Sequence, residues 1–75
     1  MSMPLPVVSG AQAVRAFERA GWVIARRKTS HIILKKAATF YTLSVPDHDE
    51  LDPGTPRSLI RKAGLTVEEF TTLLE

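Results

Sequence analysis

Residues 22–45, WVIARRKTSHIILKKAATFYTLSV, decide the fold of this 75-residue chain, because they have the composition of three short β-strands in succession. Aromatic and β-branched side chains are concentrated here, and polar or small residues interrupt them at Thr29–Ser30 and again at residues 37–39. The predicted strands span residues 22–28, 31–36 and 40–45. Connections this short predict an antiparallel meander.

The third predicted strand shows the alternation of a sheet with one buried face. Its residues Tyr41, Leu43 and Val45 alternate with Phe40, Thr42 and Ser44. Because successive side chains of a strand point to opposite faces, we expect the first set to face the core.

A helix is predicted before the sheet, over about residues 10 to 20. Ser9 and Gln12 have the spacing of a capping box, which satisfies free amides at a helix start. Gly21 can end the helix in the left-handed conformation. The apolar stripe of this helix consists of Ala13, Val14, Phe17 and Ala20.

A second helix is predicted after the sheet, which Pro46 ends. Residues 47–54 are polar and without periodicity, as expected of a loop. Thr55 can cap a helix whose first residue is Pro56, where the missing amide hydrogen has no cost, and Gly64 closes that helix.

A short last helix completes the predicted fold. Thr66 and Glu69 repeat the capping-box spacing, and the apolar stripe that follows is Val67, Phe70 and either Leu73 or Leu74. The element order α-β-β-β-α, with this extra C-terminal helix, predicts an α+β fold in which the helices pack on one face of a three-stranded antiparallel sheet.

Length and composition are consistent with one small domain over residues 1–75. The absence of cysteine excludes disulfides and zinc-thiolate sites, and it fits a reducing compartment. Apolar runs such as residues 32–34 are far shorter than the roughly 18 residues of a membrane-spanning helix. Residues 1–6 lack the charged and apolar regions of a signal peptide. We therefore expect a soluble, cytoplasmic protein.

Charge is distributed unevenly along the chain, although the net charge is only +2. Residues 1–37 carry seven Lys and Arg against one Glu, or +6, and residues 38–75 carry three against seven Asp and Glu, or −4. Such asymmetry indicates either a polyanion-binding surface or an ordinary solvated surface.

His31 is the main candidate for chemistry. It follows the first predicted turn, and five basic residues flank it in sequence: Arg26, Arg27, Lys28, Lys35 and Lys36. Cleavage of RNA without a metal needs a base for the 2′-hydroxyl proton, an acid for the departing 5′-oxygen, and cations around the phosphate. Imidazole can fill either proton-transfer role near neutral pH. An ordinary surface histidine on a basic hairpin fits the same spacing, so both interpretations stay open.

Strand pleating divides the second strand into two faces. One face carries His31, Ile33 and Lys35, and the other carries Ile32, Leu34 and Lys36. We expect Ile32 and Leu34 beneath the helices, which leaves Ile33 and Phe40 on the open face. An apolar spot beside basic residues suggests a surface for a partner, although single exposed apolar residues are common.

Other patterns have structural explanations. Acidic residues in the segment 47–52 surround His48, but their order does not match a calcium-binding loop, so a solvated loop is predicted. The aromatic side chains that could stack on bases are assigned instead to the core: Phe17, Trp22, Tyr41 and Phe70.

Several short stretches of the sequence, taken in chain order, resemble the conserved motifs of one known protein family. Ser9–Gly10 opens the first helix, and residues 20–22, AGW, stand where the family usually has Ala-Gly-Phe. Residues 29–34, TSHIIL, match the motif Gly-Ser-His-x-x-Leu, and residues 45–65 are close to a C-terminal signature. Over nearly its whole length the chain resembles the HicA-type toxins, small mRNA interferases of type II toxin-antitoxin systems with a fold like that of double-stranded RNA-binding domains.

The resemblance implies a metal-independent endoribonuclease that acts on mRNA, uses no cofactor, and is held inactive by a HicB-type antitoxin covering the site around His31. His31 would be the general acid or base, and Ser30 would orient it or the phosphate. The five basic residues would bind the RNA backbone. His48 also matches the family pattern, either as a second proton donor or through a hydrogen bond that stabilises its loop.

Two positions depart from the family pattern. Thr29 replaces the glycine before Ser-His, and a β-branched residue tolerates positive φ poorly, so we expect a wider or strained hairpin that affects the placement of His31. Pro56 replaces the usual leucine, which should remove an apolar contact. A non-catalytic RNA-binding module, which would read duplex shape, and a protein-interaction domain are the alternatives.

Overall fold

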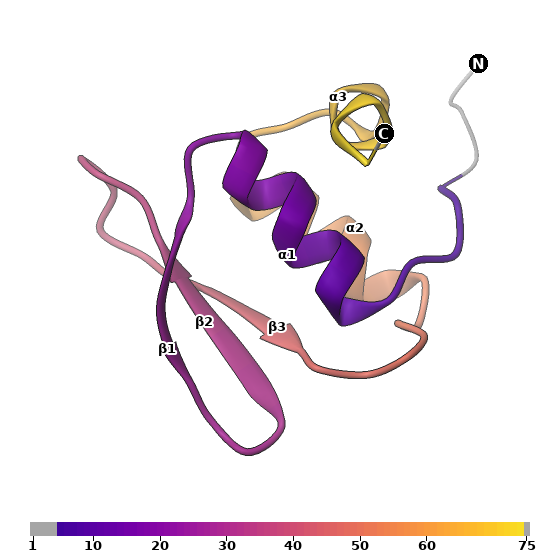
Figure 1. The fold of residues 1–75 in the computed structure, drawn as a ribbon. Coiled ribbons are helices and arrows are strands. Elements are labelled where there is room, and N and C mark those ends of the chain that lie inside the picture. The colour runs from indigo at the N-terminus through magenta and orange to yellow at the C-terminus, as the bar shows by residue number, and fades with distance from the viewer. Residues whose placement is uncertain (1–4, 75) are drawn as a thin grey trace.

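The computed structural model describes residues 5–74 of the chain. The first four residues, to which part of the signal-peptide prediction refers, lie outside this range. Three helices and three strands follow one another as α1 Gly10–Arg19, β1 Val23–Arg27, β2 His31–Lys35, β3 Leu43–Pro46, α2 Gly54–Lys62 and α3 Val67–Leu73 (Figure 1). The predicted element order and α+β class are confirmed.

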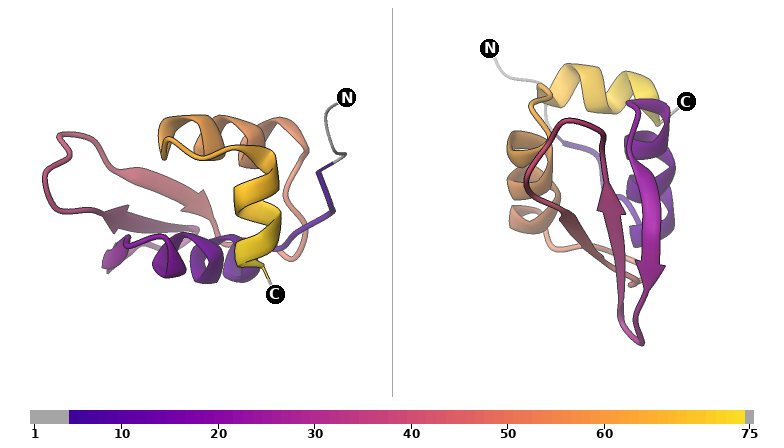
Figure 2. Two further views of the ribbon diagram at one scale, coloured as in Figure 1. Left: turned by 90° about the horizontal axis from the view of Figure 1, so that it is seen from above. Right: turned by 90° about the vertical axis from the view of Figure 1, so that its left-hand side faces the viewer.

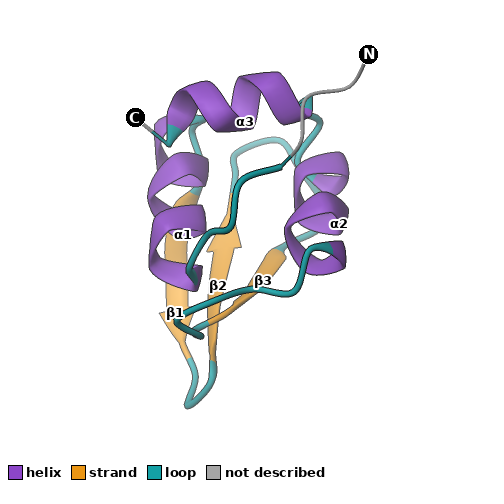
Figure 3. Ribbon diagram, turned by 90° about the vertical axis from the view of Figure 1, so that its right-hand side faces the viewer, coloured by secondary structure: helices purple, strands orange, loops and turns teal. Residues whose placement is uncertain are grey.

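The three strands form an antiparallel sheet in the order β1-β2-β3, as the short connections predicted. The helices lie on one face of this sheet, with α1 and α2 side by side and α3 across one end (Figures 2 and 3). The opposite face of the sheet carries no helix.

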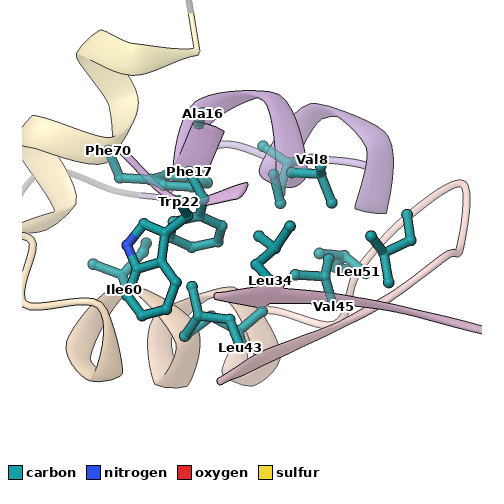
Figure 4. Close-up of a cluster of buried hydrophobic side chains, with 14 residues drawn as sticks. Val8, Ala16, Phe17, Trp22, Leu34, Leu43, Val45, Leu51, Ile60 and Phe70 are labelled. Atoms are coloured by element: carbon teal, nitrogen blue, oxygen red, sulfur yellow. The ribbon is translucent and has the colours of Figure 1, made fainter. Parts of the chain in front are cut away.

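The core lies between the sheet and the helices (Figure 4). Ile32 and Leu34 of β2 are buried there, as predicted, and Trp22 closes the core just before β1 begins. Phe17 of α1 and Phe70 of α3 are fully buried with their ring centroids 5.2 Å apart. Aromatic burial of this kind attaches the short α3 to the rest of the fold.

Local signals set the helix ends. Both capping boxes form: the Gln12 amide donates to Ser9 Oγ at 3.1 Å, and the Glu69 amide donates to Thr66 Oγ1 at 3.0 Å. Gly21, with φ of +102°, follows α1 and helps to reverse the chain into β1. These predictions from the sequence are confirmed.

The third strand differs from its prediction at both ends. It begins at Leu43 rather than Phe40, and it extends through Pro46. The chain turns through Ala38 at φ of +66°, and the Thr39 amide and hydroxyl both donate to the Lys36 carbonyl. This local bonding makes residues 36–42 a wide loop in place of a tight hairpin.

The wide loop also determines the exposure of two aromatic residues. Phe40 is fully exposed, as the open-face prediction allowed, with a relative accessibility of 105%. Tyr41 was assigned to the core, but 45% of its surface is exposed, because it precedes the paired part of β3.

The second helix also starts earlier than predicted. α2 begins at Gly54, its N-cap is Pro53, and no side chain caps it, so Thr55 does not have the predicted capping role. Pro56 is the third helical residue, where its missing amide hydrogen still has no cost, since the first four amides of a helix lack intrahelical partners. Its ring is fully buried, so an apolar contact exists at this position.

Within residues 5–74, none of the helices is long and apolar enough to cross a membrane.

Candidate functional site

His31 is the first residue of β2 and is half-buried; because the alternate residues Ile32 and Leu34 are buried under the helices, His31 lies on the sheet face that carries no helix. The hairpin that holds it is fixed from both sides. The Lys28 amide donates to the His31 carbonyl at 2.7 Å, and the Asp47 amide donates to the Ser30 carbonyl at 2.9 Å. These bonds tie the Thr29–Ser30 turn to both neighbouring strands, so the backbone that places the imidazole is held in position.

The imidazole has one protein partner within the described residues. Ser30 Oγ lies 3.1 Å from His31 Nδ1, and the direction of donation depends on the histidine tautomer. If the hydroxyl donates, the ring is neutral with its proton on Nε2, which then offers only a hydrogen bond to a ligand. The imidazolium, which is the form that acts as an acid, carries protons on both nitrogens and donates through Nδ1 instead. If Nδ1 of the neutral ring donates, Nε2 is free to accept a proton. In either case Ser30 occupies Nδ1 and leaves Nε2 for a ligand.

The predicted hairpin strain is absent. Thr29 does not have a positive φ, and Ala38 is the one non-glycine residue between residues 5 and 74 that does. The threonine at the position of the family's glycine is therefore accommodated without left-handed backbone.

A β-bulge brings Arg26 to the face of His31. Ile24 pairs with Leu34, but Arg26 pairs with Ile33, so Ala25 is an extra residue in β1. With regular pairing Arg26 would lie opposite Ile32, on the helix side. The bulge moves it to the open face, as bulges near functional sites commonly do. No pattern within the amino-acid sequence indicates this bulge.

The five basic residues do not form one cluster. Arg26 and Lys28 share the open face and the hairpin end with His31. Arg27 is exposed opposite Ile32, on the other face. Lys35 is on the open face but at the far end of β2, roughly 13 Å from His31 at the usual rise of a strand. Lys36 is turned toward the helix side, with Nζ 6.0 Å from the centre of the Trp22 ring.

The cations at the hairpin are not neutralised within the described part of the chain. Arg26, Arg27 and Lys28 are exposed, and they make no ion pair with any carboxylate of residues 5–74. Unpaired cations beside an imidazole provide an electrostatic site for a phosphate group.

His48 lies in the loop after β3 and is exposed. Its carbonyl accepts a hydrogen bond from the Gly10 amide at 2.8 Å, whereas its ring makes no hydrogen bond to residues 5–74. This bond is made by the main chain, so both roles expected for the His48 side chain stay predictions. In the same part of the chain, no three His, Asp or Glu side chains gather as a metal-binding group.

A sequence model of the HicA toxins of bacterial toxin-antitoxin systems matches residues 10–65. This chain belongs to the HicA toxin family. The match runs from the start of α1 past the end of α2 and includes the whole sheet with His31. A toxin of this kind has an antitoxin as its partner. Among curated proteins no match is found.

The α3 helix lies beyond the matched residues of this HicA-family chain, yet it is packed tightly onto α1. Besides the contact between Phe17 and Phe70, Arg19 Nη1 donates to the Leu73 carbonyl at 2.6 Å. A cation at the C-terminus of a helix stabilises the free carbonyls there. The site on the opposite face of the sheet is thus left uncovered by α3.

Proposed function

We propose that this HicA-family chain is an endoribonuclease that cleaves mRNA without a metal ion, with His31 as general acid or base. The observation that carries the proposal is the half-buried His31 ring, which Ser30 orients through Nδ1 beside the unpaired Arg26 and Lys28. Membership of a toxin family and the match of residues 29–34 to its histidine motif support the same role.

In the proposed reaction the 2′-oxygen of the RNA attacks the adjacent phosphorus while the bond from phosphorus to the 5′-oxygen breaks. One proton leaves the 2′-hydroxyl and another is delivered to the 5′-oxygen. The products are a 2′,3′-cyclic phosphate and a 5′-hydroxyl. His31 Nε2 performs one of the two transfers, and Arg26 and Lys28 stabilise the negative charge that accumulates on the phosphate oxygens.

The experiment that tests this proposal measures whether the chain cleaves RNA. The purified chain is incubated with end-labelled single-stranded mRNA in EDTA, and the products are identified by their termini. A non-catalytic RNA-binding module is the second candidate, favoured by the unpaired hairpin cations alone. RNA binding without any cleavage would support that module and reject the nuclease.

Affinity for RNA should depend on the hairpin cations. Changing Arg26 and Lys28 together to Glu is expected to weaken RNA binding and to flatten its salt dependence. Losing two phosphate contacts should change the slope of log K against log salt by about 1.4, at roughly 0.7 per contact for a single strand. Binding titrations between low and moderate salt measure this slope.

The matched control is Arg57→Glu with Arg61→Glu, which makes the same change in net charge on two exposed residues of α2. This double variant should keep the parental slope, because α2 lies on the helix side of the sheet. Equal effects of the two double variants would show that net charge, and not the hairpin surface, determines affinity.

The antitoxin, which we propose to be of the HicB type, is expected to cover the site directly. The open face offers exposed cations and the half-buried Ile33 next to His31, so an acidic segment with an apolar residue would fit it. Amide hydrogen exchange of the toxin in complex with its antitoxin, compared with the toxin alone, should show new protection over residues 26–36. Protection confined to α3 would reject direct occlusion.

A further inference from the structure

The sheet has a second distinctive surface at the end opposite His31. Here the wide loop after β2 and the start of β1 enclose a hollow of about 310 Å³. We call it the end patch; its lining residues include Val23, Lys35, Phe40 and Tyr41. The loop after β2 and the turn before His31 lie at opposite ends of the sheet (Figure 1).

The end patch combines exposed apolar side chains with positive charge. Val23 is 60% exposed, and Phe40 and Tyr41 are the exposed aromatic residues of the described chain. Lys35 and Lys36 also line the hollow, none of its lining residues is acidic, and Lys62 Nζ lies 5.7 Å from the centre of the Tyr41 ring. Aromatic rings interleaved with cations are typical of surfaces that bind single-stranded nucleic acid.

The Phe40 ring is available for stacking. The residue is fully exposed, and no ring contact holds it against the protein within residues 5–74. Stacking on a base requires a free aromatic face, which a buried ring does not offer. The left-handed Ala38 turn and the bonds of Thr39 to Lys36 fix the loop that presents this ring.

Val23 and Lys35 of the end patch pair with each other on the open face, in line with His31. Lys35 and His31 are on the same side of β2, with Ile33 between them and Arg26 opposite Ile33 on β1. The separation of roughly 13 Å along the strand corresponds to about four nucleotides at the 3.4 Å spacing of a stacked strand, and to fewer nucleotides when the strand is extended.

We propose that the end patch is a second RNA-binding subsite, which stacks an unpaired base on Phe40 and contacts a phosphate through Lys35. This inference rests on the proposed ribonuclease function, and it specifies the substrate as single-stranded RNA extending from His31 toward the wide loop. Bases within a duplex are stacked on each other and do not present a free face to Phe40. A protein partner could occupy the same patch instead of RNA, and the effect of a Phe40 substitution on RNA affinity distinguishes the two.

The experiment measures the affinity of a labelled 12-nucleotide single-stranded RNA, made uncleavable by 2′-fluoro substitution, for the full chain. Phe40→Ala should weaken binding about 5- to 160-fold, the usual range for loss of one stacked base. Phe40→Trp should retain the affinity. Since the Phe40 ring packs against nothing, its truncation should leave the fold intact, which a thermal melt of each variant checks.

Two controls isolate the patch. Val7→Ala removes another exposed apolar side chain, 72% exposed and located in the segment before α1, and should not alter affinity. A duplex of the same sequence should bind the parent and Phe40→Ala equally.

The NMR signal of the Trp22 indole N–H can report whether RNA binds at the end patch. Trp22 is the one tryptophan of the chain, its ring lies 6.3 Å from that of Tyr41, and its buried Nε1–H has no hydrogen-bond partner within the described residues. Because Tyr41 lines the end patch, RNA that moves the Tyr41 ring should shift the indole N–H resonance of Trp22 beside it.

Each alternative result has a defined meaning. If the parent binds and cleaves RNA while Phe40→Ala binds it equally well, the second subsite is rejected and the ribonuclease proposal stands. If the parent binds no RNA, both proposals fail. If Phe40→Ala weakens only the antitoxin complex, the patch is a protein interface and the RNA assignment is overturned.

Discussion

His31→Ala is expected to lower the rate of RNA cleavage by roughly 10²- to 10⁴-fold, the usual contribution of a positioned acid or base. The alanine removes the ring whose Nδ1 lies 3.1 Å from Ser30 Oγ and whose Nε2 is left for the substrate. RNA binding should survive, because Arg26 and Lys28 remain and phosphate contacts supply most of the nonspecific affinity. Single-turnover cleavage of a labelled mRNA in EDTA measures the rate, and growth after induction provides a second readout.

His48→Ala is the matched control for this prediction. The His48 ring is exposed and makes no hydrogen bond to residues 5–74, so its removal should leave the fold unchanged. If both variants lose comparable activity, two histidines share the proton transfers. A His31→Ala protein that cuts RNA and arrests growth like the parent would eliminate the proposed role of His31.

The helices were predictable because their signals are local. A capping box, a glycine after the last turn and an apolar stripe act within one or two helical turns, and residues 9–21 contain all three. The start of α2 was predicted two residues late because Pro56 fits either the first or the third position of a helix, and both lack an amide partner. Local chemistry cannot distinguish these positions.

The third strand was less predictable because its start depends on a neighbour. Residues 40–45 alternate as a strand should, yet pairing begins only where Leu43 meets Leu34. The turn at Ala38 decides this, and an alanine at φ of +66° gives no sequence signal comparable to glycine. Tyr41 was assigned to the core for the same reason, whereas its ring lies at the surface against Trp22.

The sequence predicted which residues belong to the candidate site, but not which of them lie together in the structure. Sequence proximity placed five cations around His31, whereas pleating, strand length and the bulge at Ala25 separate them. Lys36 lies over the Trp22 ring on the helix side, and both Lys35 and Lys36 line the end patch. A bulge depends on how two strands pair, so a pattern within one strand does not reveal it. The proton-transfer role of His31 stays a prediction that the cleavage experiment tests.

Gly10→Ala is expected to lower the free energy of unfolding by about 3 kcal/mol, at the upper end of the usual cost of overpacking. A Cβ built on Gly10 would lie 2.1 Å from the Pro46 carbonyl oxygen, which is backbone and cannot rotate away. The start of α1 would have to move, and the hydrogen bond from the Gly10 amide to the His48 carbonyl would break or lengthen. For a chain of this length, total stability is roughly 4 to 11 kcal/mol, so the loss is a substantial share. Urea unfolding monitored by circular dichroism measures it.

Gly54→Ala provides the matched control, because Gly54 is also the first residue of a helix but has nothing within 4 Å of an added Cβ. Alanine there should leave stability unchanged or raise it by up to about 1 kcal/mol, through the reduced entropy of the unfolded chain. We expect the same contrast in RNA cleavage, because the segment that Gly10 touches also holds the hairpin that carries His31: the Asp47 amide donates to the Ser30 carbonyl beside His31. Displacing residues 46–48 would therefore shift the imidazole, so Gly10→Ala should lose activity even at temperatures where it remains folded. Equal urea midpoints for the two variants would show that α1 can move away from Pro46 without loss of stability. In that case the close approach at Gly10 would not determine the position of the His31 hairpin.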